Sequence, residues 1–492
     1  MKRMTSLAAA VLLALGLCSV AQAADIKARG YWWIEAVSRS NWDFNASRSN
    51  AFSIEEKLRT AFTFTANENL RGILDTQIGT QNWGAGLYQI SAGRTPNSTA
   101  TGANGAGNGN IMLRKAYIEY KWPETATNIS VGFQTVTLPA AFGGGSPILD
   151  DQVAAAVVST PLTDSVSLVA GYVRPADSNN FGSTANINGT GTSADAAFAM
   201  LPIKTQTMNI TPYGMFLYAG SQAAGTNSNL NSATLLGLAG PNSSTSEGVR
   251  GYWGGASFTM IPEELPLKVM ADFHYGKATY TNYFNNTKDG GRAGWMADLA
   301  VDYTGLSYMT PEAYFVYSSG ESGQNPDRSG RMPVVGVPQN WSVGTGSFFF
   351  GERLELAGSI NNPSGYTLFT LGYWAAGVAL KNISFVDKLS HDLNILYAKG
   401  TNSADYLKNT VNLRGVNYAG FLTEKDSLWE VDLNSRYKIY DELTAYLYLG
   451  YINSHFDTAT WGASAVTNAG NIAASGSSGN AYKVGVGLNY FF

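Results

Sequence analysis

Histidine is the side chain that proteins use most often for acid–base catalysis near neutral pH. This chain contains three histidines, His274, His391 and His455, and neither an H-E-x-x-H pair nor a G-x-S-x-G nucleophile motif accompanies them. A Ser–His pair that cleaves lipid would have to face the lipid, whereas His274 shares a parity with the charged residues Lys268 and Asp272. We therefore predict that the protein is not an enzyme.

The sequence also offers few residues in the spacings of known metal-binding motifs. Cys18 is the only cysteine, so no zinc–cysteine site, disulfide or thiol nucleophile is expected after export. Acidic loop residues such as Asp289 and Asp327 could bind calcium, although the EF-hand spacing is absent. The sequence predicts no metal site and no cofactor, with a structural calcium ion as the alternative.

The first 23 residues are typical of a cleaved secretory signal peptide. Lys2 and Arg3 precede an apolar run from Leu7 to Leu17 that is too short to span a bilayer, and a small-residue cleavage site follows at residues 21–23. A lipid-attachment signal at Cys18 is the alternative, but bulky Leu17 fits it poorly. We expect a single domain over residues 24–492.

The bulk composition narrows the class of protein. The formal charge is −4 and becomes −6 once Lys2 and Arg3 are removed, which argues against a nucleic-acid partner. Hydrophobic residues make up 45% of the chain, yet no apolar run after the signal peptide is long enough for a membrane-spanning helix. In lipid, a closed β-barrel is the other structure that satisfies every backbone N–H and C=O group.

The apolar residues alternate with polar ones at period two, as half-buried strands require. Apolar residues take the odd positions in residues 267–277, 295–303 and 428–440, while charged residues such as Lys268, Asp298 and Glu430 take the even positions. A secreted β-sandwich, β-helix or propeller would also alternate, but we find no fixed repeat period. The pattern favours an all-β, antiparallel, up-and-down transmembrane β-barrel.

Short and long connections alternate between the expected strands. Short turns fall at residues 67–69, 123–128, 161–164, 262–264, 387–388 and 441–442 and at Gly305. Long segments rich in Gly, Asn, Ser and Thr fill the other gaps, as in outer-membrane barrels with periplasmic turns and extracellular loops. The segments number about 18, and 16 remains open because residues 202–207 and 319–365 are ambiguous. A barrel of this size is wide enough for an aqueous channel.

The last strand ends on "AYKVGVGLNYFF", in which Tyr482, Val484, Val486, Leu488, Tyr490 and Phe492 share one face. This ending resembles the C-terminal signal of bacterial outer-membrane proteins, with Tyr490 and Phe492 as the residues that the barrel-assembly machinery would recognise. The same strand is expected to close the barrel against residues 26–36.

Three internal stretches carry a more specific resemblance: "VTLPAAFGGGSPILDD" (136–151), "NITPYGMF" (209–216) and "SGRMP" (329–333). In this order they resemble the homotrimeric outer-membrane porins of sulfate-reducing, Desulfovibrio-type bacteria, and more broadly the general Gram-negative porins. The resemblance implies a passive, trimeric, water-filled channel for small hydrophilic solutes. It also implies that the loop after the fifth strand folds inward to narrow the channel.

That loop is expected over Leu138–Asp151. Gly143, Gly144 and Gly145 would permit a bent path, and Asp150 and Asp151 are candidates for the acidic side of a pore constriction. The opposite, basic wall is expected from four residues that share the lumen parity in strands two to four: Lys57, Arg59, Arg71 and Lys115. Such opposed charges select permeants by sign. The alternative is that they only hydrate a wide pore.

We therefore expect a homotrimeric channel for passive diffusion in a bacterial outer membrane. Its expected partners are outer-membrane lipid and lipopolysaccharide, the barrel-assembly machinery and small hydrophilic solutes. Two alternatives remain open at this stage: a porin selective for sugars or oxyanions, and a plugged barrel that acts as an adhesin.

Overall fold

The structure is a computed structural model of the chain. It describes residues 25–40, 50–84, 111–177, 193–220, 248–282, 288–322, 328–335, 341–343, 372–405, 422–461 and 479–492. The expected signal peptide lies outside the described residues.

Strands dominate the described residues. In the first half of the chain they are β1 (Asp25–Ser40), β2 (Asn50–Asn67), β3 (Leu70–Asn82), β4 (Met112–Lys121), β5 (Asn128–Thr137), β6 (Asp150–Pro161), β7 (Ser167–Asp177), β8 (Ser193–Met200), β9 (Ile203–Lys204) and β10 (Met208–Ala219). In the second half they are β11 (Val249–Met260), β12 (Leu267–Asn282), β13 (Lys288–Tyr303), β14 (Thr310–Ser318), β15 (Arg328–Ser329), β16 (Tyr373–Val386), β17 (Leu389–Gly400), β18 (Ser427–Lys438), β19 (Leu443–His455) and β20 (Gly479–Phe491). A short helix, α6 (Thr458–Trp461), follows β19.

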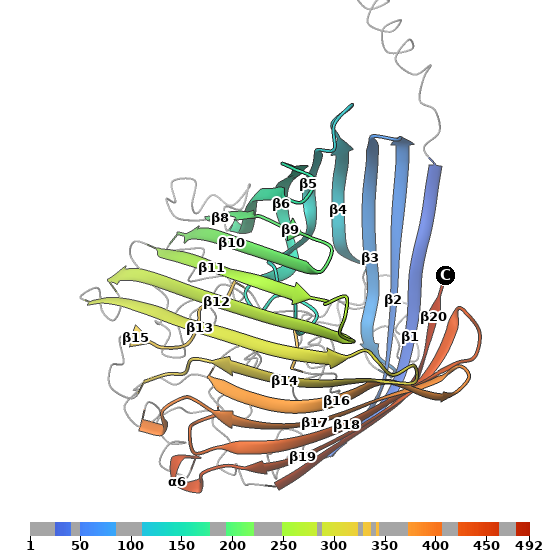
Figure 1. The fold of residues 1–492 in the computed structure, drawn as a ribbon, viewed down its shortest axis with the longest axis vertical. Coiled ribbons are helices and arrows are strands. Elements are labelled where there is room, and N and C mark those ends of the chain that lie inside the picture. Colours follow the sequence, from blue (N-terminus) through green and yellow to red (C-terminus); the bar gives the residue numbers. More distant parts are fainter. Residues whose placement is uncertain are drawn as a thin grey trace, which may run out of the picture.

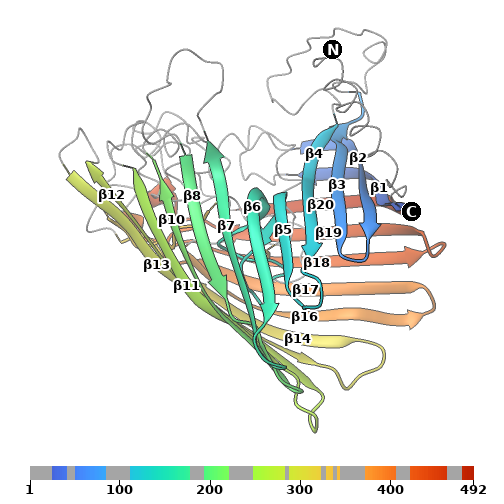
Figure 2. The ribbon, with the colours of Figure 1, turned by 90° about the horizontal axis from the view of Figure 1, so that it is seen from above.

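The strands form one closed antiparallel barrel (Figures 1 and 2). Eighteen strands make the ring, and the two-residue strands β9 and β15 are additions to it. β8 and β9 both pair with β10, one after the other, and are separated by a break at Pro202. This break explains why residues 202–207 were ambiguous in the sequence. The count of about 18 strands is confirmed.

β20 closes the ring against β1. Tyr31 pairs with Phe491 and Ser40 with Tyr482 in antiparallel register. Gly30 N donates to Phe492 O at 3.0 Å, and Phe492 N donates to Gly30 O at 3.1 Å. Among the described strands, the eighteen of the ring all have partners on both sides. The predicted pairing of the last strand with the first is confirmed, with residues 31–40 of β1 in the ladder instead of 26–36.

The two faces of the barrel wall differ as the alternation predicts. On β12 the outward Phe273 is 50% exposed, whereas the neighbouring inward His274 is 0% exposed. On β20 the outward Tyr482 is 49% exposed and the inward Lys483 is 2% exposed. Apolar and aromatic side chains therefore cover the outside, and the polar and charged ones turn inward.

Short turns join the strands at one end of the barrel. They include Asn67–Leu70 between β2 and β3, Val386–Leu389 between β16 and β17, and Lys438–Leu443 between β18 and β19. Among the described residues, no helix has the length and hydrophobicity needed to cross a membrane.

Candidate functional site in the barrel interior

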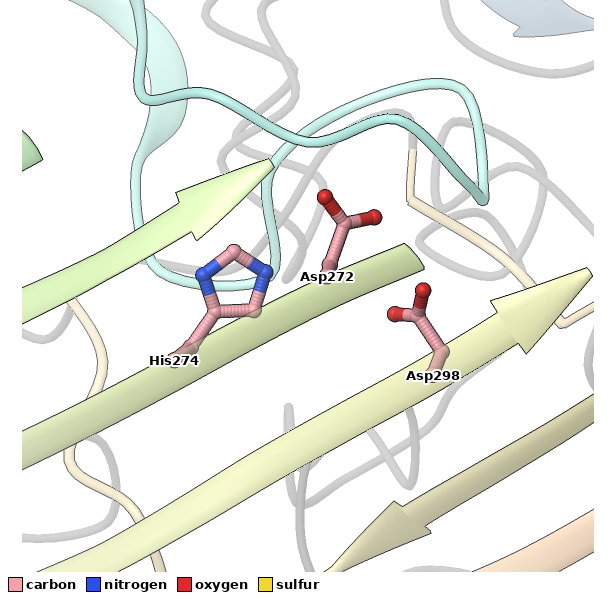
Figure 3. Close-up of side chains that lie close together, drawn as sticks. All are labelled: Asp272, His274 and Asp298. Carbon is pink, nitrogen blue, oxygen red and sulfur yellow. The ribbon is translucent and has the colours of Figure 1, made fainter. Parts of the chain in front are cut away.

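The connection between β5 and β6 folds into the barrel. Figure 3 shows it passing close to Asp272 and His274 on β12. Its apolar side chains are buried in one cluster with residues of segments 331–335 and 341–343: Leu138, Phe142, Ile148, Leu149, Met332, Val334, Val335, Trp341 and Val343. The expected inward-folded loop is thus present.

The loop is anchored at the far wall by a carboxylate. Ala141 N lies 2.8 and 2.9 Å from the two carboxylate oxygens of Asp272, and Phe142 N donates to Asp272 Oδ2 at 2.8 Å. The ring of Phe142 packs on Tyr314 of β14, with 5.5 Å between ring centroids. Hydrogen bonds to a charged acceptor are roughly twice as strong as neutral ones, so Asp272 holds the tip of the loop firmly.

Two backbone hydrogen bonds also join the loop to segments 328–335 and 341–343, which follow β14 in the sequence. Ser342 N donates to Gly143 O at 2.9 Å, and Val335 N donates to Ile148 O at 2.8 Å. Gly143 and Gly144 have φ values of 80° and 81°, in the left-handed region that glycine adopts without strain. Gly143 and Gly144 thus take a conformation that favours glycine, whereas Gly145 does not adopt a positive φ.

The loop is shorter than the sequence suggested. Asp150 and Asp151 belong to β6, because Thr137 pairs with Asp150 and Val136 with Asp151 in the β5–β6 ladder. Asp150 is 3% exposed and accepts a 2.7 Å hydrogen bond from Thr137 Oγ1, so it lies at the root of the loop. The loop proper is residues 138–149, and the role of the two aspartates in a constriction stays a prediction.

The four expected basic residues lie on neighbouring strands of one wall. Lys57 is buried, with its Nζ 5.2 Å from the Trp33 ring centroid and 5.7 Å from that of Tyr31. Arg71 forms an ion pair with Glu119, and Lys115 pairs with Asp75 in the β3–β4 register. Their effect on permeating ions is untested and stays a prediction.

The structure adds a fifth cation to this wall. Arg59 Nε and Arg114 Nη1 both donate to Gln77 Oε1, at 2.6 and 3.0 Å. Strict alternation from Lys115 would turn Arg114 outward, but the register of β3 and β4 shifts between Asp75 and Thr76. The bulge reorients Arg114, and no signal in the sequence marks it.

Carboxylates gather on the opposite wall. Eight strands separate β3 from β13 in either direction around the ring, so β2–β4 face β12–β14. Asp272 on β12 and Asp298 on β13 lie there, as do Asp302 and Glu312, which share Lys381 Nζ of β16 at 2.7 and 2.8 Å. Carboxylates thus face the basic residues across the interior, on strands where the sequence had not predicted them. Buried carboxylates also lie on other strands, among them Glu55 of β2 and Glu430 of β18.

Asp272, His274 and Asp298 also form the one group among the described residues with the composition and spacing of a metal site. All three are buried, and Figure 3 shows their side chains close together. The earlier calcium candidates are not part of it: Asp327 and the side chain of Asp289 lie outside what the structure describes.

Comparisons with known proteins yield structural likeness only. No family model and no curated protein sequence matches. Among solved structures, OccAB4 of Acinetobacter baumannii is 11% identical, with 96% of this chain and 100% of that chain covered and a TM-score of 0.49. The outer membrane protein OprD of Pseudomonas aeruginosa is 13% identical over 96% of each chain, with a TM-score of 0.47. OccK8 of the same organism is 10% identical over 95% and 98%, with a TM-score of 0.48.

Proposed function

We propose that this protein is an outer-membrane porin through which small hydrophilic solutes and ions diffuse passively. The observation that carries the proposal is the closed ring of eighteen strands with an apolar outer face and a charged inner face. Closure satisfies the backbone in lipid, and a polar, charged interior is what water-filled porin channels have. No catalytic step is required.

The same proposal includes a homotrimer in contact with outer-membrane lipid and lipopolysaccharide. The outward side chains of β20, such as Val484 and Leu488, suit either lipid or a neighbouring barrel. Tyr490 and Phe492 on that strand would serve as the signal for the barrel-assembly machinery during insertion.

A substrate-selective porin is the second candidate. The basic residues of β2–β4 that face the carboxylates of β12–β14, and the loop anchored at Asp272, favour it, because charged groups on facing walls orient dipolar or charged solutes. A sugar channel would instead show no preference for solutes of one charge over the other.

Planar-bilayer recording of the refolded full chain tests the proposal. Three equal conductance steps per insertion support an open trimer, and a reversal potential under a salt gradient reads its ion preference. Absence of any step would refute the porin and favour a plugged barrel that acts as an adhesin. Liposome uptake of a neutral sugar and an oxyanion of similar size separates general diffusion from selective transport.

A further inference from the structure

Three ligating side chains meet on the inner wall where the loop is anchored. Asp272 and Asp298 are directly opposite in the register of β12 and β13, and His274 lies two residues from Asp272 on the same face. One ligand atom from each lies within 4.8 Å of the others (Figure 3). Strand pairing alone therefore brings an imidazole and two carboxylates together.

The cluster is buried and incompletely satisfied. Asp272 is 4%, His274 0% and Asp298 5% exposed. Nε2 of His274 has no hydrogen-bond partner among the described residues. The carboxylate of Asp298 meets the carboxylate of Asp272, and the electrostatic neighbours of these two aspartates within the described part of the chain include no lysine or arginine. Two carboxylates that face each other out of water need a cation or a proton between them.

We propose that Asp272, His274 and Asp298 bind one divalent transition-metal ion of the zinc class. Asp272 and Asp298 each supply a carboxylate oxygen, and His274 supplies Nε2. An ion at this position neutralises the facing carboxylates and gives Nε2 of His274 a partner.

Neighbouring groups hold the ligands ready for metal. Tyr213 Oη lies 2.7 Å from Nδ1 of His274, and in the tautomer with the proton on Nδ1, Nδ1–H donates a hydrogen bond to the hydroxyl oxygen. That tautomer leaves the Nε2 lone pair free, as in many metal sites whose histidine is oriented by a second hydrogen bond. Ala141 N and Phe142 N orient Asp272 in the same way.

The ligand types select the class of ion. Calcium takes six to eight oxygen ligands, whereas imidazole favours zinc, nickel, copper and iron. Three protein ligands with nitrogen and oxygen donors leave a fourth position for water in a tetrahedral zinc site. This site goes beyond the proposed channel function and does not depend on it.

The test is metal titration of the refolded full chain in detergent after treatment with a chelator. Zn²⁺ binding is followed by calorimetry, and Co²⁺ by its visible absorption, which reports coordination geometry. We expect one ion per chain, with affinity lowered at least about 10-fold in His274→Gln and in Asp298→Asn. His391→Gln is the matched control, because His391 lies on β17 and contacts Ser435 instead.

Folding of each variant is checked by heat-modifiable gel mobility, and Zn²⁺ should raise the unfolding temperature of the wild type but not of His274→Gln. Absence of saturable binding by the wild type would overturn the proposal. Equal affinity in wild type, His274→Gln and Asp298→Asn would overturn it as well. Neither readout requires an open channel, so a failure here is distinguishable from a failure of the porin proposal.

Discussion

Substitution of Gly143 by alanine should displace the inward loop. Gly143 has a φ of 80°, and a Cβ at this position would lie 2.5 Å from Nε1 of Trp341. The left-handed backbone costs an alanine about 1–2 kcal/mol, and overpacking adds about 1–3 kcal/mol. Even about 2 kcal/mol shifts the balance toward a displaced loop roughly 30-fold. The loop should therefore lose its contact with Trp341 far more often than in the wild type.

Single-channel recording measures the outcome. Gly143→Ala should give a larger or noisier open-channel current than the wild type and increase protease cleavage within residues 138–149. Gly145→Ala is the matched control, because Gly145 is in the same loop without a positive φ. If currents and cleavage of Gly143→Ala equal those of Gly145→Ala, the loop does not depend on the conformation at Gly143 and the reasoning is refuted.

Three further predictions address the wall and its assembly. Lys381→Met should lower the free energy of unfolding by about 3–5 kcal/mol in a urea titration, because it leaves two buried carboxylates without their cation; an unchanged transition would contradict this. The pair Arg59→Gln and Arg71→Gln should move the reversal potential toward cation preference, whereas Arg174→Gln at the outward, exposed Arg174 should not. Deletion of Phe492 should reduce the amount of assembled barrel in outer-membrane fractions more than it alters the conductance of inserted molecules, and normal assembly would argue against a signal role.

Basic and acidic side chains face each other across the interior, although buried Glu35 and Glu55 lie on the basic side as well. Lys57, Arg59, Arg71 and Arg114 lie half a ring away from Asp272 and Asp298. Neutralising Asp150 and Asp151 remains informative: a shift of the reversal potential toward anions would place them in the ion path, and no shift would leave that role to the carboxylates of β12 and β13.

The sequence by itself determined the barrel, a strand count of about eighteen with sixteen still open, its closure and the inward parity of Lys57 and His274. Those features follow from the period-two alternation and from the turn residues, both of which are local in sequence. The alternation recurs in every strand because one face of each strand meets lipid and the other faces the interior. The inward loop was also expected, but its destination was not.

Only the tertiary structure decided which residues meet inside. The loop contacts Asp272 across 131 positions of sequence, and the register of two strands sets Asp272 opposite Asp298. A one-residue bulge turns Arg114 inward against its parity. Register, bulges and loop anchors depend on contacts between distant segments, so no window of sequence contains them.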